Sequence, residues 1–227
     1  MNKKSVALSI LSSLLLGLST QVSAALILEQ YASGASTPTV IGGNSMTDFA
    51  LIGGNASTQS IASPISGSID FHDKNMNSLT MNHSTANNTS WWVNGESFDY
   101  DIYTTNLNQV VITLPTDTLA FSFNVGADLG STGNNAWLTA VETDGSGIDT
   151  KHWFNVNRTN TPGFGIYSST DNCSYIQSVT IDPLLWGFGN FSISQGDCST
   201  TVPEPNVLVL FGLGFLGLGL LRRREVI

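Results

Sequence analysis

The chain has 227 residues and a formal net charge of −9, with 11% charged and 9% aromatic residues. Disordered chains are poor in aromatic and β-branched residues, so this composition excludes a largely disordered protein and indicates one folded, β-rich domain with polar loops. Between residues 25 and 205, three Lys and Arg stand against sixteen Asp and Glu, a formal charge of −13 that argues against nucleic acid as a partner and leaves neutral glycans, cations and proteins.

Residues 1–24 have the pattern of a secretory signal peptide. Lys3 and Lys4 precede an apolar run over residues 6–18, and Val22-Ser23-Ala24 places small residues at a cleavage site. The alternative is an uncleaved membrane anchor, but the run is shorter than the ~20 residues that a span needs. We therefore expect cleavage after Ala24.

Residues 25–201 alternate between apolar and polar side chains with a period of two, which predicts strands. Between residues 119 and 125, one face is expected to be apolar and the other small or polar. Glycine-rich turns separate the short runs, so we predict an all-β domain, a single β-sandwich of jelly-roll or lectin-like type. The expected strands are Ser68–Phe71, Phe98–Tyr103, Val110–Leu114, Leu119–Val125, Ala136–Val141, His152–Val156, Ile176–Ile181 and Phe188–Ile193.

Carboxylates gather at two places in this domain. Asp99 and Asp101 alternate with apolar residues, which predicts that they form the solvent face of the 98–103 strand. Paired carboxylates are also the machinery of glycoside hydrolysis, so a hydrolase or lyase is an alternative function. The candidate acids for that alternative are Glu96, Asp99, Asp101, Glu142 and Asp144. Because acidic residues are frequent here, we assign no catalytic residue.

Metal and cofactor sites have little support in the sequence. Asp70 and His72 would share a face of a strand, which suits a metal, but a polar strand end explains the segment more simply. Asp144–Asp149 combines oxygen ligands with glycines, as calcium prefers, yet it does not match the EF-hand loop and an ordinary hairpin turn explains it. We expect no metal and no cofactor, with calcium as the alternative.

Trp91 and Trp92 are adjacent within a stretch rich in Asn and Thr. Neighbouring strand residues point to opposite faces, so one ring can be buried while the other is exposed. An exposed indole suits the C–H face of a sugar. Packing of both rings in the core is the simpler interpretation, and a glycan contact through one of them is the functional alternative.

Cys173 and Cys198 are the two cysteines of the chain. In an exported, oxidised protein such a pair indicates a disulfide. Closing a loop of this length would stabilise the fold by ~3.5 kcal/mol on the chain-entropy model. The alternatives are two free thiols or a metal pair that lacks its other ligands.

Residues 202–227 form a distinct tail. Pro203-Glu204-Pro205 precedes an apolar run over residues 207–221, and Arg222-Arg223-Arg224 follows it. As a helix, the run would be ~22 Å long, a marginal transmembrane span whose arginines keep the C-terminus cytoplasmic. Residues 212–217 spell G-x-G-x-x-G, but no βαβ unit surrounds them, so they are small residues of a membrane helix and not a dinucleotide site.

This tail resembles the PEP-CTERM sorting signal in its Pro203-Glu204-Pro205 motif, its Gly-rich apolar helix and its terminal arginines. The resemblance implies that the tail inserts transiently into the membrane and is recognised by an exosortase-type membrane protease, which cleaves near the motif. It also implies a Gram-negative bacterium that makes exopolysaccharide as the source of the protein. Asn206 and Val207 stand where small Ser, Thr or Ala residues are common in that family, which leaves the cleavage point open.

The body also resembles the all-β extracellular domains found upstream of such tails. Its last strands look like the end of a lectin-like or carbohydrate-binding-module-like sandwich. The segments that carry this resemblance are Ile41–Gly43, Ala120–Val125, Thr161–Ile166, Val179–Asp182 and Phe188–Ile193. It implies a fold and a glycan context rather than an activity.

Together these patterns predict an exported surface or extracellular-matrix protein, associated with exopolysaccharide or biofilm and capable of glycan binding without catalysis. The alternatives are a polysaccharide hydrolase or lyase on the same scaffold and a purely structural matrix protein. Two facing acids in one groove would favour the enzyme, whereas exposed aromatic and amide side chains would favour binding.

Overall fold

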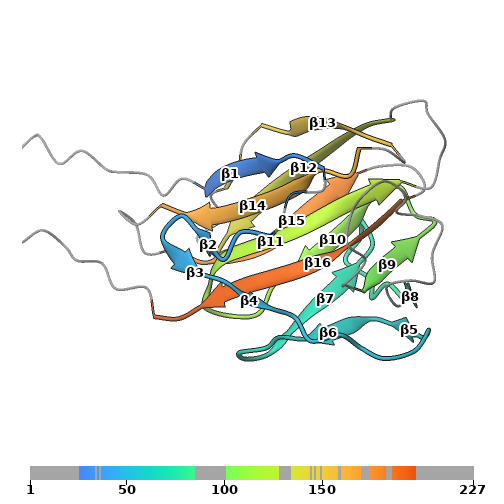
Figure 1. The fold of residues 1–227 in the computed structure, drawn as a ribbon, viewed down its shortest axis with the longest axis horizontal. Helices are drawn as coiled ribbons and strands as arrows, with labels where there is room; N and C mark the ends of the chain where they lie inside the picture. Colours follow the sequence, from blue (N-terminus) through green and yellow to red (C-terminus); the bar gives the residue numbers. More distant parts are fainter. Residues whose placement is uncertain are drawn as a thin grey trace, which may run out of the picture.

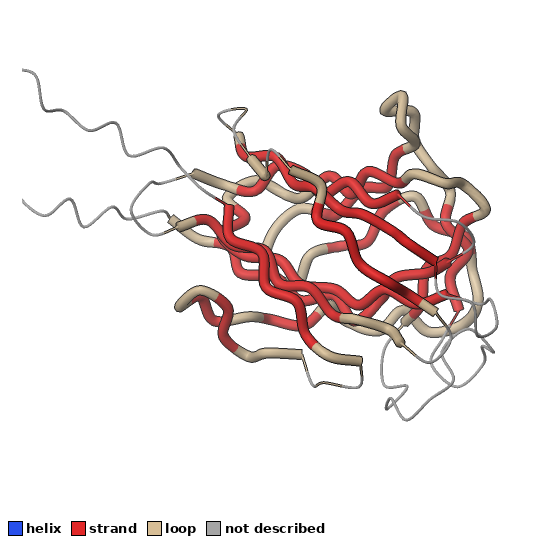
Figure 2. The backbone as a smooth tube through the Cα atoms, turned by 90° about the horizontal axis from the view of Figure 1, so that it is seen from above, coloured by secondary structure: helices blue, strands red, loops and turns tan. Residues whose placement is uncertain are grey.

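The computed structural model describes the globular part of the chain. The described residues are 26–33, 35, 37–84, 101–127, 134–143, 145, 147–148, 150–157, 160–169, 174–182 and 186–197. Within them the secondary structure is strand and turn without helix, and the strands form two stacked layers (Figures 1 and 2). The predicted all-β sandwich is therefore confirmed.

The two large sheets are antiparallel throughout. The eight-stranded sheet contains, in order, β1 (Leu26–Tyr31), β14 (Gly163–Ser168), β11 (Thr118–Ala127), β16 (Trp186–Gln195), β9 (Ile102–Thr105), β8 (Met81–Ser84) and β5 (Ser57–Thr58), with β4 (Thr47–Asp48) paired to β16. The six-stranded sheet contains, in order, β13 (His152–Val156), β12 (Asn134–Glu142), β15 (Ile176–Asp182), β10 (Val110–Thr113), β7 (Ser68–His72) and β6 (Ser60–Ala62). A separate two-stranded sheet joins β2 (Val40–Ile41) to β3 (Asn44–Ser45).

The last eight strands are shared equally between the two large sheets, and each strand crosses to the other sheet except at the β12–β13 hairpin. They lie in the order β9-β16-β11-β14 in one sheet and β10-β15-β12-β13 in the other. This arrangement is that of a jelly roll, in which two Greek keys interlock. Each crossing carries the chain over one end of the sandwich, so loops distant in sequence meet at those ends.

An aromatic core holds the two layers together. Phe121 is fully buried, with its ring centroid 5.6 Å from that of Phe123 and 5.8 Å from that of Phe191. From the opposite sheet, Phe71 on β7 places its ring 5.9 Å from that of Phe188. Strands present every second side chain to this interior, which is why the apolar members of the predicted alternation lie here.

The small and polar face of β11 is buried as well as its apolar face. Ser122 is 2% exposed and its hydroxyl lies 2.6 Å from that of Ser192. The N-terminal segment covers this outer face: Ile41 and the Tyr31 ring lie so close to Gly165 that an added Cβ there would stand 2.6 Å from the tyrosine oxygen. The polar face is therefore buried under a further layer of chain.

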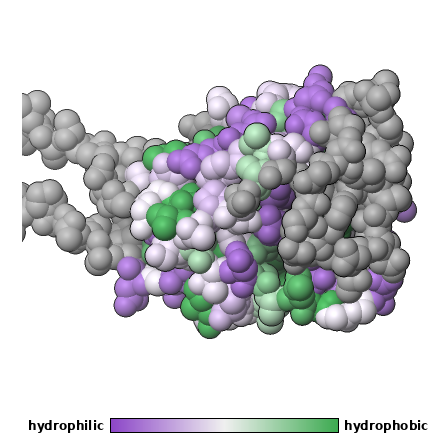
Figure 3. All heavy atoms as spheres, viewed as in Figure 1, coloured by the Kyte–Doolittle hydropathy of each residue, from purple (hydrophilic) through white to green (hydrophobic). Residues whose placement is uncertain are grey.

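The outer side viewed in Figure 3 carries apolar side chains only in small, separate groups, with polar ones between them. Exposed apolar side chains that are scattered singly are normal for a soluble surface. This view therefore gives no sign of a large apolar docking patch.

Replacing Phe121 by Ala should lower the free energy of unfolding by about 3–5 kcal/mol, because it empties a fully buried ring site between the sheets. Urea denaturation monitored by tryptophan fluorescence measures the change. Leu51→Ala, at a side chain that is 61% exposed, is the matched control and should shift stability by less than about 0.5 kcal/mol. Equal midpoints for Phe121→Ala and the control would contradict the assigned core.

Candidate functional site

Two tryptophans meet on the outer face of the six-stranded sheet. On β12, Ala136 and Leu138 point into the core, so Trp137 between them points outward. On β13, Phe154 points inward and its neighbour Trp153 points outward by the same alternation. Trp137 and Trp153 are direct cross-strand partners, which places the two indoles side by side on one surface.

The two indoles differ in their accessibility. Trp153 is 62% exposed, the most exposed large apolar side chain of the described residues, whereas Trp137 is only 9% exposed. The Lys151 ammonium lies 3.8 Å from the centroid of a Trp137 ring, in cation–π geometry. Trp153 therefore has a ring face that a ligand can reach, whereas one ring face of Trp137 is occupied by the Lys151 ammonium.

This surface continues across the sheet. Trp137 is paired on its other side with Asp182 at the end of β15. Gln109, just before β10, and Lys74, just after β7, lie with Asp182 around one pocket. We call the set Trp153, Trp137, Asp182, Gln109 and Lys74 the outer row, since its members follow one another from strand to strand across the sheet.

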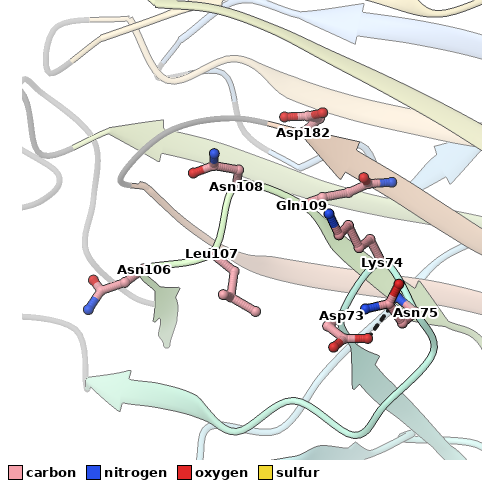
Figure 4. A pocket seen from close by; sticks show the side chains of 8 residues that line it. All are labelled: Asp73, Lys74, Asn75, Asn106, Leu107, Asn108, Gln109 and Asp182. Carbon is pink, nitrogen blue, oxygen red and sulfur yellow. Dashed lines mark hydrogen bonds between the residues drawn. The ribbon is translucent and has the colours of Figure 1, made fainter.

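The pocket has a volume of about 510 Å³ and a mostly polar lining. Figure 4 shows Lys74 reaching toward Gln109, with Asp182 beyond them and the β9–β10 loop along the other side. The remaining lining residues are Asp73, Asn75, Asn106, Leu107 and Asn108. Amide groups both donate and accept hydrogen bonds, so this lining suits a ligand that carries many hydroxyl groups.

A hydrogen-bonded turn fixes the near wall of the pocket. The Asp73 carboxylate accepts hydrogen bonds from the Asn77 side chain at 3.0 Å and from the Asn77 and Asn75 backbone N–H groups at 2.9 and 2.8 Å. The hydrogen bonds from Asn77 contribute most, and with the Asn75 N–H and the charge of Lys74 they hold the pKa of Asp73 below its ordinary value. The carboxylate is thus ionised at neutral pH and keeps Lys74 and Asn75 in place.

Asp101 does not lie on a solvent face, and that interpretation is wrong. It is 6% exposed; its Oδ2 lies 3.1 Å from Nε2 of His83 and accepts the Ile52 backbone N–H at 2.5 Å. Residues 50–55 cross over this strand end, and the carboxylate satisfies one of their donors. A second pocket, of about 320 Å³, lies beside it and is lined by Asp48, Phe49, Ala50, Leu51, Asp101, Tyr103, Asn190 and Phe191.

Removing the buried carboxylate should destabilise the domain strongly. We expect Asp101→Ala to cost about 3–5 kcal/mol of stability, because it leaves the Ile52 N–H and the His83 ring without their buried partner. Chemical denaturation measures the loss, and His83→Ala in the same background should add less than its separate effect. Asp48→Ala, at an exposed carboxylate of the same pocket, should be nearly neutral; equal losses for the two acids would count against a structural role for Asp101.

Other residues singled out in the sequence are dispersed. Glu142 is fully buried and accepts the Ser168 hydroxyl at 3.0 Å; it ends β12, the strand of Trp137, but it is not among the residues that line the pocket of the outer row. Asp70 and His72 share the outer face of β7, but no group of three or more His, Cys, Asp or Glu side chains that could hold a metal occurs among the described residues. Asp144 and Asp149 of the calcium alternative are outside the described part.

Several expectations cannot be placed, because their residues lie outside the described ones. They are Ala24 of the signal peptide, Trp91 and Trp92, Glu96 and Asp99, the pair Cys173 and Cys198, and Pro203, Glu204, Pro205 and Arg222–Arg224 of the tail. In the part of the chain that is described, there is no helix long and apolar enough to cross a membrane.

Sequence reasoning missed Trp137 and Trp153, although it predicted both of their strands. The available signal was the alternation of the strands. Trp137 lies between two core residues and Trp153 directly precedes one, and a strand with one buried face carries polar side chains at such positions. A large aromatic residue at a position that faces solvent is informative, since burial is its ordinary state.

The chain matches none of the curated proteins in sequence. Three solved structures are similar to it at low identity. A family 11 carbohydrate-binding module of the cellulosomal cellulase Lic26A-Cel5E of Clostridium thermocellum is 8% identical, with 75% of this chain and 95% of that chain covered and a TM-score of 0.21. The CBM22-1 xylan-binding domain of Paenibacillus barcinonensis Xyn10C is 9% identical, with coverages of 77% and 99% and a TM-score of 0.16.

The third, the mannan-recognising carbohydrate-binding module TmCBM27, is 10% identical, with 75% of this chain and 98% of that chain covered and a TM-score of 0.17. At TM-scores this low, none of the three likenesses carries an argument about a site or a ligand of this chain.

The C-terminal region has a specific match. Residues 201–224 fit the family model of the PEP-CTERM protein-sorting motif, which confirms the resemblance inferred from the proline–acid–proline segment, the apolar run and the arginines. Proteins with this motif are exported and sorted to the cell surface by exosortase-type processing. The chain is therefore an exported protein that carries a PEP-CTERM protein-sorting motif at its C-terminus.

Proposed function

We propose that the exported domain is a non-enzymatic glycan-binding module, and that the outer row is its binding surface. The single observation that carries this proposal is the exposure of Trp153 in the same row of cross-strand partners as Asp182, which lines a pocket of amide and carboxylate groups two strands away. An indole offers an apolar platform to the C–H face of a sugar ring. The amides can bond the hydroxyl groups of the next rings, because each has both donors and an acceptor.

The charge of the domain and its export support the same function. A body with a formal charge of −13 repels dense polyanions, whereas a chain of mainly neutral sugars pays no such electrostatic penalty. An exported protein meets the polysaccharide outside the cell. In this proposal the protein associates with the exopolysaccharide or biofilm matrix of the producing bacterium, and Trp91 and Trp92 remain further candidates for sugar contacts.

Trp153→Ala should weaken retention on the exopolysaccharide of the producing bacterium by about 3- to 10-fold, corresponding to about 0.5–1.5 kcal/mol of lost stacking. A pull-down with that polymer and a melting curve for each variant provide the measurements. Because Trp153 is exposed, the melting temperature should hardly change.

Leu51→Ala is the matched control, since it removes a similarly exposed apolar side chain from the other side of the sandwich. Unchanged retention by Trp153→Ala would overturn the assignment of the surface. Shortening of the polymer by the wild-type protein would instead favour a polysaccharide-active enzyme.

The remaining proposals concern processing. We propose that the signal peptide is removed after Ala24, that Cys173 and Cys198 form a disulfide, and that the helix over residues 207–221 holds the protein in the membrane until an exosortase-type protease cleaves near Pro203-Glu204-Pro205. The proline–acid–proline segment supports cleavage there. Its prolines prevent the helix of the marginal membrane span from extending back toward the domain.

If this processing occurs, the surface-associated protein should lack Arg222–Arg224. Intact-mass measurement of the protein from its native host decides the matter, with a strain that lacks the exosortase as the comparison. A mature mass that still includes the three arginines would show that the tail is retained.

A further inference from the structure

The few cations of this acidic domain are concentrated on one surface. Between residues 25 and 205 the only Lys and Arg residues are Lys74, Lys151 and Arg158. Lys74 belongs to the outer row, and Lys151 lies over the Trp137 ring of that row. Both cations within the described residues therefore lie along the proposed glycan surface, while the acidic residues are distributed over the whole domain.

Neither ammonium group lies within 4 Å of a carboxylate of the described residues. Among the described residues, the pair within 4 Å is His83 with Asp101, which lies at another site. Lys151 Nζ is held against an aromatic face. Lys74 shares its pocket with Asp73 and Asp182 and, after the Asn77 hydrogen bonds, helps to lower the pKa of Asp73 by its charge, but among the described residues it makes no ion pair within 4 Å. Both groups keep donors for a ligand, since an ammonium has three.

The two lysines are separated by the width of the sheet. Lys151 precedes β13 and Lys74 follows β7, and the strand order β13-β12-β15-β10-β7 contains four intervals between them. At ~4.8 Å per interval β13 and β7 are ~19 Å apart, and the Lys151 ammonium reaches toward β12, where it lies over Trp137. A glycan that runs perpendicular to the strands from Trp153 to the pocket would pass both cations.

We propose that the outer row recognises an extended glycan whose mainly neutral chain carries isolated carboxylates, as an acidic sugar does, and that Lys151 and Lys74 bind those carboxylates. This inference rests on the proposed glycan-binding function and adds the class of glycan. The ammonium groups offer charge-assisted hydrogen bonds to a carboxylate. The charge of −13 on the body excludes dense polyanions, so the acidic groups must be sparse.

The position of Lys151 supports its role as a specificity-determining residue. It precedes β13 by one residue and Trp153 by two, and its ammonium lies over the ring of Trp137, the cross-strand partner of Trp153. A sugar that stacks on Trp153 therefore has an ammonium beside it. A neutral ring would use the indole alone, whereas a ring with a carboxylate would use both groups.

The test compares one polymer in two charge states. The probe is the exopolysaccharide of the producing bacterium, either native or after carbodiimide activation and borohydride reduction, which converts its carboxylates to primary alcohols on the same backbone. Wild-type protein should bind the native polymer about two- to fivefold more tightly than the reduced one, the range expected for exposed charge pairs. The preference should shrink as salt is added.

Lys151→Met and Lys74→Met keep chain length and remove the charge. Each should weaken binding of the native polymer about two- to fivefold and leave binding of the reduced polymer unchanged. Ser45→Glu, at an exposed residue of the β2–β3 sheet, makes the same change in net charge away from the outer row and should alter neither. Melting curves for all three variants separate binding from stability.

The outcomes distinguish the inference from the function on which it rests. Carboxylate recognition would be overturned if the wild-type protein bound the native and the reduced polymer with equal affinity. It would also be overturned if Lys151→Met weakened binding of the two polymers equally, which would mean that Lys151 acts by holding the Trp137 ring. If Trp153→Ala still weakens both polymers in that case, glycan binding stands. If the wild-type protein binds neither polymer, the proposed function itself is wrong.

Discussion

The alternation of side chains across each strand is the constraint on which the rest of this structure depends. The sandwich is stable because the inward residues of two sheets meet in an aromatic core, and the pleat then fixes where every neighbouring residue points. Ala136, Leu138 and Phe154 face the core, so Trp137 and Trp153 must face outward. The proposed binding surface is therefore a direct consequence of how the core is filled. A shift of one residue in either strand would turn its tryptophan into the core and its core residues toward solvent.

The outer faces of the two sheets differ in how far other segments of the chain cover them. The N-terminal segment lies over the eight-stranded sheet and buries Ser122 and its partner Ser192. On the six-stranded sheet the outer face retains Trp153 and opens into a polar pocket. One face thus contributes to stability through a second buried layer, and the other keeps side chains available to a ligand.

The position of the pocket also suits the sorting of the protein. The β9–β10 loop that lines it follows Thr105, which pairs with Trp186 at the start of β16. The ten residues of β16 then run to Gln195, a distance of ~30 Å. The chain leaves the domain toward its sorting motif at the end opposite to the pocket, so attachment through the tail would leave the outer row accessible.

Local features can be read from the amino-acid sequence alone. Apolar residues in alternation predicted strands such as β11, and a continuous apolar run predicted β10. The contiguous tail, which needs no folding partner to be recognised, indicated export and sorting. The three-dimensional fold was needed to show that Asp101 is buried against His83 and Ile52 and that the polar face of β11 is covered. It was also needed to bring Trp153, Asp182 and Lys74 onto one surface. The reason is that alternation shows which residues share a face of a strand, whereas strand order and the covering of that face depend on contacts between segments distant in the chain.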